Sequence, residues 1–225
     1  MRRTIFLIVI GLGGAAILLS LGVWQIQRLA WKEGVIADIE ARIAADPVAL
    51  PKTLDPEQDS YLPVRVEGTL GDRYLRVLVS QKQIGAGYRI ISPLETDAGR
   101  IMVDRGFVPT DRSDITTPDE PVGISGNLQW PQETDSFTPE PDLSGNIWFA
   151  RDVAAMAAAL DTLPVLVVAR QSTFDDAPVT PLPVDTSAIP NDHLQYAITW
   201  FSLAAIWVAM SLAFLLRARR AKTPD

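Results

Sequence analysis

The chain has 225 residues, of which 20 are Lys or Arg, 27 are Asp or Glu, one is His and none is Cys. The lack of Cys excludes disulfide frameworks, thiol catalysis, iron–sulfur clusters and covalent c-type haem attachment, and a single His excludes a multi-His metal site. The net charge of −7 argues against nucleic acid as a partner, because phosphate binding requires a basic surface.

Two uncharged apolar segments lie near the ends of the chain, at residues 5–24 and 196–216. Each is long enough to cross the roughly 30 Å hydrocarbon core of a membrane as a helix of about 20 residues. The first segment exceeds the apolar region of a secretory signal peptide, which has about 7–15 residues, so an uncleaved anchor is favoured over a signal peptide. We therefore expect transmembrane helices at residues 5–25 and 193–216.

The distribution of Lys and Arg predicts that both termini are cytoplasmic, because cytoplasmic flanks of membrane helices are enriched in these residues. Residues 217–225 carry four basic residues, and Arg2 and Arg3 precede the first apolar segment. Between the tails at 1–4 and 217–225 lies an exported segment, residues 26–192, with 14 basic and 26 acidic residues. The tails are too short for the output module of a two-span sensor.

The exported segment begins with a helical pattern that extends the first membrane helix to about Ala45, before Asp46-Pro47. The hydrophobic period then changes to two, which is typical of strands. We expect strands at 61–67, 74–79, 88–94, 100–108, 122–130, 147–150 and 164–169, a hairpin turn at 96–99, and a short helix at 152–160. Residues 175–192 contain four Pro and are expected to form an extended linker.

Short strands between turns rich in Gly and Pro favour a small, mostly antiparallel β barrel or sandwich. The expected fold class is therefore an α+β membrane protein. Two transmembrane helices, N-terminal and C-terminal, flank a mostly antiparallel β domain with short helices, and this domain is expected to be periplasmic.

Three sequence patterns could indicate a catalytic or cofactor site, but each is better explained without one. Gly85-Ala86-Gly87-Tyr88 lacks the third Gly and the helix of a dinucleotide fingerprint, so we expect a turn. Asp104-Arg105-Gly106 is expected to hold a structural ion pair at a strand end. A Ser-His-Asp hydrolase would have to use His193, but the adjacent Asp192 is poorly placed to orient that imidazole. We therefore expect no enzymatic activity.

Residues 190–201, PNDHLQYAITWF, form the most informative segment. Asp192 and Gln195 approximate a capping box, which places His193 in the first turn of the second membrane helix, at the outer interface. Three aromatic residues follow at intervals of 3, 7 and 14 and share the face of His193: Tyr196, Trp200 and Trp207.

The first membrane helix carries a matching set, because Trp24, Arg28 and Trp31 are spaced i, i+4, i+7. Small residues on both segments favour close packing, which would bring His193, Arg28 and several aromatic rings together. A non-covalent haem needs an axial imidazole, an aromatic slot and cations for its propionates. The residues alone favour the alternative, in which His193 and Arg28 are polar anchors at the membrane boundary.

Two long motifs resemble signatures of the surfeit-locus cytochrome oxidase assembly family. Residues 21–32, LGVWQIQRLAWK, resemble its LGxWQxxRxxWK signature, and residues 190–201 resemble PNNHLxYAxTWF. Two shorter segments, YLPV at 61–64 with Gly68 and VDRGFVP at 103–109, resemble further family segments.

The sequence departs from the family pattern at two positions: Asp192 stands where Asn is usual, and Phe107 where Trp is usual. Neither departure removes the His. Asp192 would place a negative charge beside that imidazole.

The resemblance implies a bacterial accessory protein for haem–copper oxidase biogenesis, which binds haem a and helps to insert it into the catalytic subunit. By position, His193 would be the ligand of the haem a iron. Trp24, Arg28, Tyr196 and Trp200 lie in the matching motifs and are the other candidate haem-binding residues. The implied partners are the oxidase catalytic subunit, the haem a synthesis machinery and membrane lipid.

Only four residues precede the first apolar segment, too few for a mitochondrial presequence, so we expect the bacterial cytoplasmic membrane as the location. Two alternatives stay open. The first is a cofactor-free scaffold that holds assembling oxidase subunits, and the second is a periplasmic hydrolase on two membrane anchors.

Overall fold

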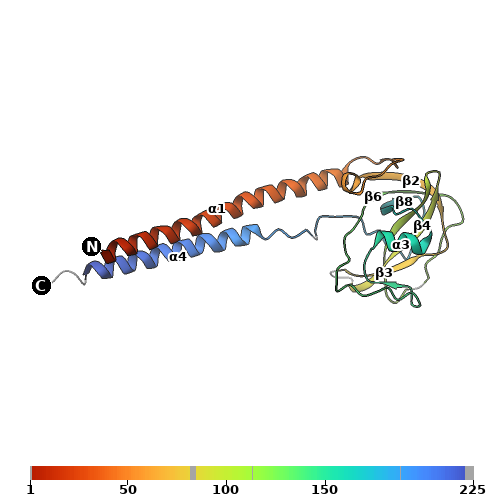
Figure 1. Cartoon of the computed structure of the whole chain (residues 1–225). Helices are drawn as coiled ribbons and strands as arrows, with labels where there is room; N and C mark the ends of the chain where they lie inside the picture. Colours follow the sequence, from red (N-terminus) through yellow and green to blue (C-terminus); the bar gives the residue numbers. More distant parts are fainter. Residues whose placement is uncertain (1, 82–84, 113, 188, 221–225) are drawn as a thin grey trace. The chain divides into compact units, whose positions relative to one another are not determined.

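The computed structural model describes four stretches of the chain: residues 2–81, 85–112, 114–187 and 189–220. The chain forms two compact units, which are described separately (Figure 1). The helix pair comprises the residues up to Asp38 and from Thr186 onward, and the β domain extends from Ile39 to Asp185.

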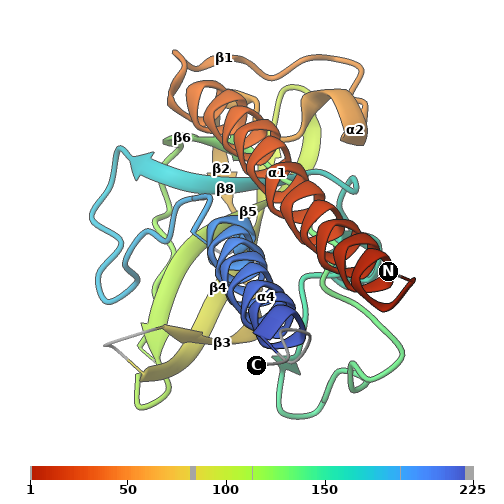
Figure 2. The same ribbon diagram turned by 90° about the vertical axis from the view of Figure 1, so that its left-hand side faces the viewer.

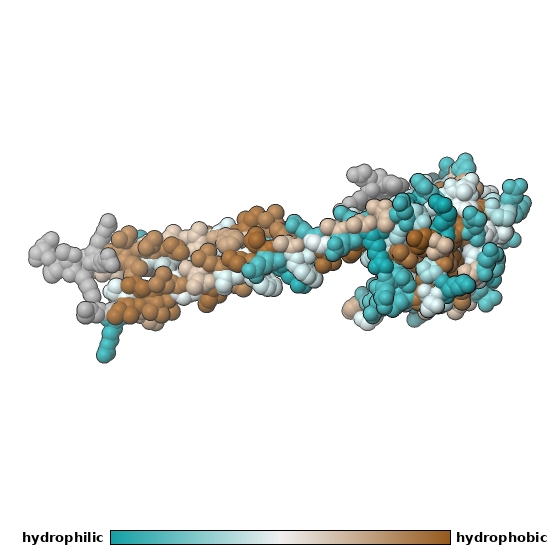
Figure 3. Space-filling model, turned by 90° about the horizontal axis from the view of Figure 1, so that it is seen from above, coloured by the Kyte–Doolittle hydropathy of each residue, from teal (hydrophilic) through white to brown (hydrophobic). Residues whose placement is uncertain are grey.

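The helix pair consists of α1, Arg2–Ala44, whose last residues belong to the β domain, and α4, His193–Arg220. Both helices are long and apolar enough to cross a membrane, and their surface is mostly hydrophobic (Figure 3). Only 11% and 6% of their apolar windows is buried, unlike the core helix of a soluble protein. The prediction of candidate membrane helices at both ends of the chain is thus confirmed.

The two helices run antiparallel and pack through small residues. Gly14 lies against the indole of Trp207, and Gly22, further along α1, lies against Phe201, which comes earlier in α4. The Trp207 indole N–H also donates a hydrogen bond to the carbonyl oxygen of Gly11 at 3.0 Å. Close approach at small residues is the usual way in which membrane helices associate.

We predict that Gly14→Leu separates the two helices, because its side chain would occupy the space of the Trp207 ring. Disulfide formation between Gly11→Cys and Ser211→Cys in membranes measures this, since the chain has no other Cys and a Cβ at Gly11 would lie 3.1 Å from that of Ser211. We expect roughly tenfold less cross-linking, which corresponds to about 1.4 kcal/mol.

Gly13→Leu is the matched control, because nothing lies within 4 Å of a Cβ at that position. Equal cross-linking in the Gly13→Leu and Gly14→Leu backgrounds would show that the packing face of α1 is wrongly assigned.

The described residues of the β domain form eight strands and two short helices. The strands are β1 Val48–Ala49, β2 Pro63–Leu70, β3 Leu75–Gln81, β4 Gly85–Thr96, β5 Gly99–Pro109, β6 Val122–Leu128, β7 Ile147–Trp148 and β8 Leu166–Ser172. The helices are α2 Pro56–Asp59 and α3 Val153–Leu160. All seven predicted strands and the predicted helix are present, and the short β1 and α2 are additions. The expected turn at 85–88 is wrong, because these residues begin β4.

Strand pairing closes part of the sheet into a barrel (Figure 2). The strand order is β1-β2-β6-β8-β5-β4-β3-β7, and an additional pairing of β2 with β4 completes a ring of β2, β6, β8, β5 and β4. Five of the pairings are antiparallel, and those of β1 with β2, β3 with β7 and β5 with β8 are parallel. The sheet is therefore mostly antiparallel, and it forms a barrel rather than a sandwich.

Two large hydrophobic clusters and a smaller one, formed by Ile90, Val108 and Val179, stabilise the described part of this sheet. The first contains side chains from all five barrel strands, such as Val64, Leu94 and Val103. The second packs Met156 of α3 against other strand side chains, including Met102. Met102 and Val103 belong to different clusters because successive side chains of a strand point to opposite faces.

The predicted linker at 175–192 is wrong for its first part, which packs into the β domain. Val179 and Val184 are buried, and the backbones of Thr180 and Phe107 exchange two hydrogen bonds, of 2.7 and 2.8 Å. Gly106 permits this approach, since its φ is +129° and a Cβ there would overlap the Thr180 carbonyl. The chain leaves the β domain only after Asp185.

Asp104 and Arg105 do not form the expected ion pair, because as neighbours within β5 they point to opposite faces. Asp104 is fully buried and lies 2.6 Å from Arg89, whereas Arg105 is paired with Asp176. Burial raises the pKa of Asp104, against the opposing effect of Arg89 and Arg151. The role of both residues is structural, as predicted, but their partners are more than ten residues away in the sequence.

Glu133 binds Arg151, whose Nη2 lies 2.5 Å from its carboxylate. Burial works to raise the pKa of Glu133, but the hydrogen bonds and charge of Arg151 together hold that pKa below its ordinary value of 4.5. This contact therefore stabilises the fold above about pH 4.5, and the stabilisation is lost as the pH falls through the lower pKa of the folded state.

We predict that Glu133→Gln lowers the stability of the β domain at pH 7 by about 1 kcal/mol, a modest value because the carboxylate is 39% exposed. The difference from wild type should shrink as the pH falls below 4.5. Thermal unfolding followed by near-ultraviolet circular dichroism measures it, with the exposed Glu140→Gln as control. A difference that grows in acid would contradict this account.

Candidate functional site

His193 and Gln25 form a polar contact between the two helices of the helix pair. Nδ1 of His193 lies 2.8 Å from Oε1 of Gln25, and only 8% of Gln25 is exposed. His193 is half-buried and is the first residue of α4, so it follows Asp192 directly as the sequence predicts.

The position of Gln25 follows from the helical period. Gln25 lies three residues after Gly22 and seven after Leu18, on the face of α1 that packs against α4. It is 14 residues from Gly11, or about 21 Å along the helix axis at 1.5 Å per residue. Since Arg28 follows within one turn, the His193–Gln25 contact lies where the apolar part of the helix pair ends.

Arg28, Trp24 and Trp31 form a neighbouring stripe on α1. The guanidinium of Arg28 lies 3.8 Å from the ring centroid of Trp31, in a cation–π contact. All three residues are exposed, Trp24 to 53% and Trp31 to 52%. The structure thus stacks Arg28 on Trp31, a contact that the sequence spacing alone did not indicate.

The aromatic residues of α4 divide between two environments. Trp200 and Trp207 are half-buried, whereas Tyr196 is 55% exposed. Trp207, which the sequence placed on the His193 face, contacts Gly11 and Gly14 and serves helix packing. Tyr196 and Trp24 instead present exposed rings on the outside of the helix pair.

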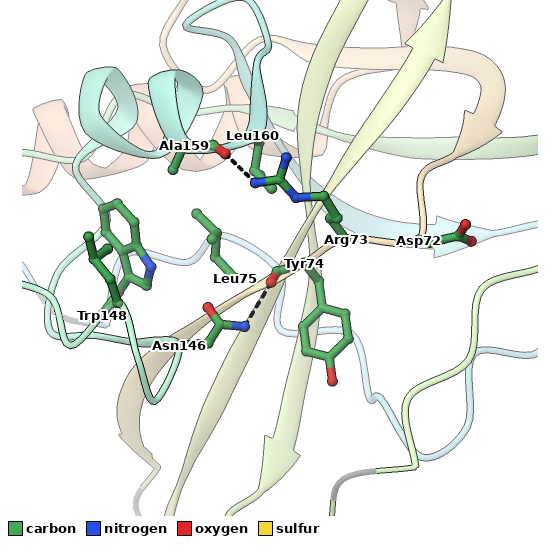
Figure 4. A pocket seen from close by; sticks show the side chains of 9 residues that line it. Asp72, Arg73, Tyr74, Leu75, Asn146, Trp148, Ala159 and Leu160 are labelled. Atoms are coloured by element: carbon green, nitrogen blue, oxygen red, sulfur yellow. Dashed lines mark hydrogen bonds between the residues drawn. The ribbon is translucent and has the colours of Figure 1, made fainter.

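The β domain contains concavities, and Figure 4 shows one of about 440 Å³. Two of its polar side chains bond to backbone: Asn146 donates to the carbonyl of Tyr74 at 2.9 Å, and Arg73 donates to that of Ala159 at 2.7 Å. Among its described lining residues, Asp72 is the sole carboxylate and none is His or Ser. The arrangement gives no support to a hydrolase in this cavity.

No group of three or more His, Cys, Asp or Glu in the described part of the chain is placed to hold a metal ion.

Sequence reasoning missed Gln25 as the partner of His193. The signal was present, since Gln25 continues the spacing of the small residues Gly14 and Gly22 on one helix face. A polar residue on an interhelical face needs a hydrogen-bond partner, and His193 is the titratable residue that α4 brings to that level.

A model of the SURF1 family matches residues 12–205 of the chain. The chain is 32% identical over 217 residues to a SURF1-like protein of Drosophila melanogaster and 32% identical over 213 residues to Surfeit locus protein 1 of Homo sapiens. Both alignments cover 83% of this chain and 70% of the relative. A bacterial SURF1-like protein, from Rickettsia bellii, is 29% identical over 205 residues, with 86% and 84% coverage.

Proposed function

The chain belongs to the SURF1 family, and from this premise we propose that it is a membrane-anchored assembly factor for a haem–copper oxidase that binds haem a through His193. The observation that carries the proposal is the imidazole of His193, which is held at one nitrogen by Gln25 at the end of an apolar helix pair.

The residues at this end of the helix pair fit a haem. The Nδ1 contact of His193 leaves Nε2 as the nitrogen that would ligate the haem iron. Arg28 is exposed and supplies a cation for a propionate, while Trp24 and Tyr196 supply exposed aromatic surface. Trp200 is half-buried and lies seven residues after His193, on the same face of α4.

Bound haem a supplies the iron that the imidazole ligates. The chain itself binds and orients this group, and we propose no catalytic step for it. In this account, the exposed rings and the apolar helix surface exclude water from the macrocycle, and Arg28 fixes its orientation by charge.

We further propose that both termini are cytoplasmic and that the acidic β domain is periplasmic, in the cytoplasmic membrane of a bacterium. The partners would be the catalytic subunit of the oxidase, which receives the haem, and the machinery that makes haem a. A bacterial relative that covers 86% of the chain is compatible with this location.

The test is to purify the full-length protein in detergent from a host that makes haem a and from one that does not. We expect haem a in the first preparation, and a saturable Soret shift when haem a is added to the second. An oxidase subunit that co-purifies while both preparations stay haem-free would favour a cofactor-free scaffold and contradict the proposal.

A further inference from the structure

The contact between Gln25 and His193 favours one of the two neutral tautomers of the imidazole. A neutral imidazole has one N–H donor and one unprotonated acceptor nitrogen. The Gln25 atom that faces Nδ1 is the carbonyl oxygen Oε1, at 2.8 Å. Because an amide oxygen accepts hydrogen bonds and does not donate them, a neutral imidazole in this contact would carry its hydrogen on Nδ1 and leave the lone pair on Nε2.

We infer that Gln25 is a positioning residue, which selects the imidazole tautomer of His193 that can ligate iron and holds the ring in place. The inference rests on the proposed function, since it assigns a role toward the same haem. Metal-ligating His residues typically donate their second ring N–H to a carboxylate or carbonyl, and loss of that acceptor commonly weakens metal affinity about 10–100-fold.

Burial of Gln25 supports this role over that of a chance contact. The side chain is 8% exposed, in a helix whose apolar window is otherwise exposed, so its amide is among the few buried polar groups of the chain. Competition from water for the hydrogen bond is limited, and a buried polar group without a partner costs free energy. The imidazole and the amide therefore hold each other in a fixed arrangement.

Four residues near this pair in the sequence make other contacts. Arg28 stacks on Trp31, and the Asp192 carbonyl accepts the Tyr196 amide at 3.2 Å within the first turn of α4. The Asp192 side chain is exposed. Gln25 is thus the described side chain whose hydrogen bond with the imidazole sets the tautomer.

The single His makes a direct test possible, because ¹⁵N-histidine labels one imidazole only. In the haem-free wild-type protein at alkaline pH, we expect the Nδ1 resonance of a protonated nitrogen and the Nε2 resonance of an unprotonated one. Gln25→Leu removes the acceptor, so both tautomers should appear. Gln25→Glu restores a carboxyl oxygen and should restore the single tautomer, whereas Gln27→Leu, at an exposed site two residues away, should change nothing.

The second readout is haem a itself, added to each variant. We expect Gln25→Leu to bind haem a about 10–100-fold more weakly and to shift its reduction potential, with Gln25→Glu close to wild type in affinity. Unchanged tautomer, affinity and potential in Gln25→Leu would overturn the inference while leaving the proposed function intact. A wild-type protein that shows the Nδ1–H tautomer but takes up no haem a would contradict the proposed function, while the assignment of the Gln25 acceptor would stand.

Discussion

Arg105→Leu is expected to destabilise the β domain by about 3–5 kcal/mol, the usual cost of removing one partner of a buried ion pair. The Arg105 side chain is 1% exposed and the Asp176 side chain 11%. Its guanidinium donates to both Asp176 oxygens and, at 2.7 Å, to the carbonyl of Thr116. The substitution leaves the Asp176 carboxylate buried without its cation.

Urea unfolding of the detergent-solubilised protein, followed by pulse proteolysis of the β domain, measures this effect. The control is Arg112→Leu, because Arg112 and its partner Asp114 are both more than half exposed, and such surface pairs contribute less than about 1 kcal/mol. In the double variant Arg105→Leu/Asp176→Leu, most of the loss should be recovered, because no unpaired charge remains. A single variant as stable as the Arg112 control would refute the structural role of Arg105.

This ion pair also gives a structural role to the segment VDRGFVP at 103–109, which the sequence showed only as a resemblance to a family segment. In the segment at 103–109, Arg105 binds Asp176, Gly106 allows the approach of Thr180, and Phe107 pairs with the Thr180 backbone. Three successive residues thus secure the segment that runs from the barrel toward α4. Arg105 and Asp176 are 71 residues apart in the sequence, so no local sequence pattern predicts that they pair.

The elements of the fold were predictable because their signals are local. A change of hydrophobic period at residue 61 marks the strands, and uncharged runs of about 20 residues mark the membrane helices. The strand β1 was not predictable, since two residues carry no periodicity. Barrel closure was not predictable either, because it depends on a β2–β4 pairing of only two residue pairs, Thr69 with Glu95 and Leu70 with Leu94.

The candidate site was predictable in part. His193 stands out by sequence because it is the chain's one imidazole and starts an apolar helix. Its contact with Gln25 spans 168 residues and depends on the register of two antiparallel helices, which no sequence spacing fixes. Because of the same register, Trp207 lies against Gly11 and not at the candidate site.

His193→Gln is expected to lower haem a affinity by about 100-fold or more, equivalent to at least about 2.7 kcal/mol, because a side-chain amide replaces the axial imidazole. An amide at this position can still bond to Gln25, so the packing of the helix pair should be retained. His193→Gly should bind haem a again when free imidazole is added, which separates loss of ligation from loss of fold. Leu194→Ala, at an adjacent exposed residue, is the control.

Haem a content and Soret spectrum, recorded side by side for wild-type and His193→Gln protein from haem a-producing cells, test whether His193 ligates haem a. We expect haem a with an imidazole-ligated spectrum in the wild type, and little or no haem a in equally folded His193→Gln protein. Equal haem a content and identical spectra in the two proteins would contradict this expectation.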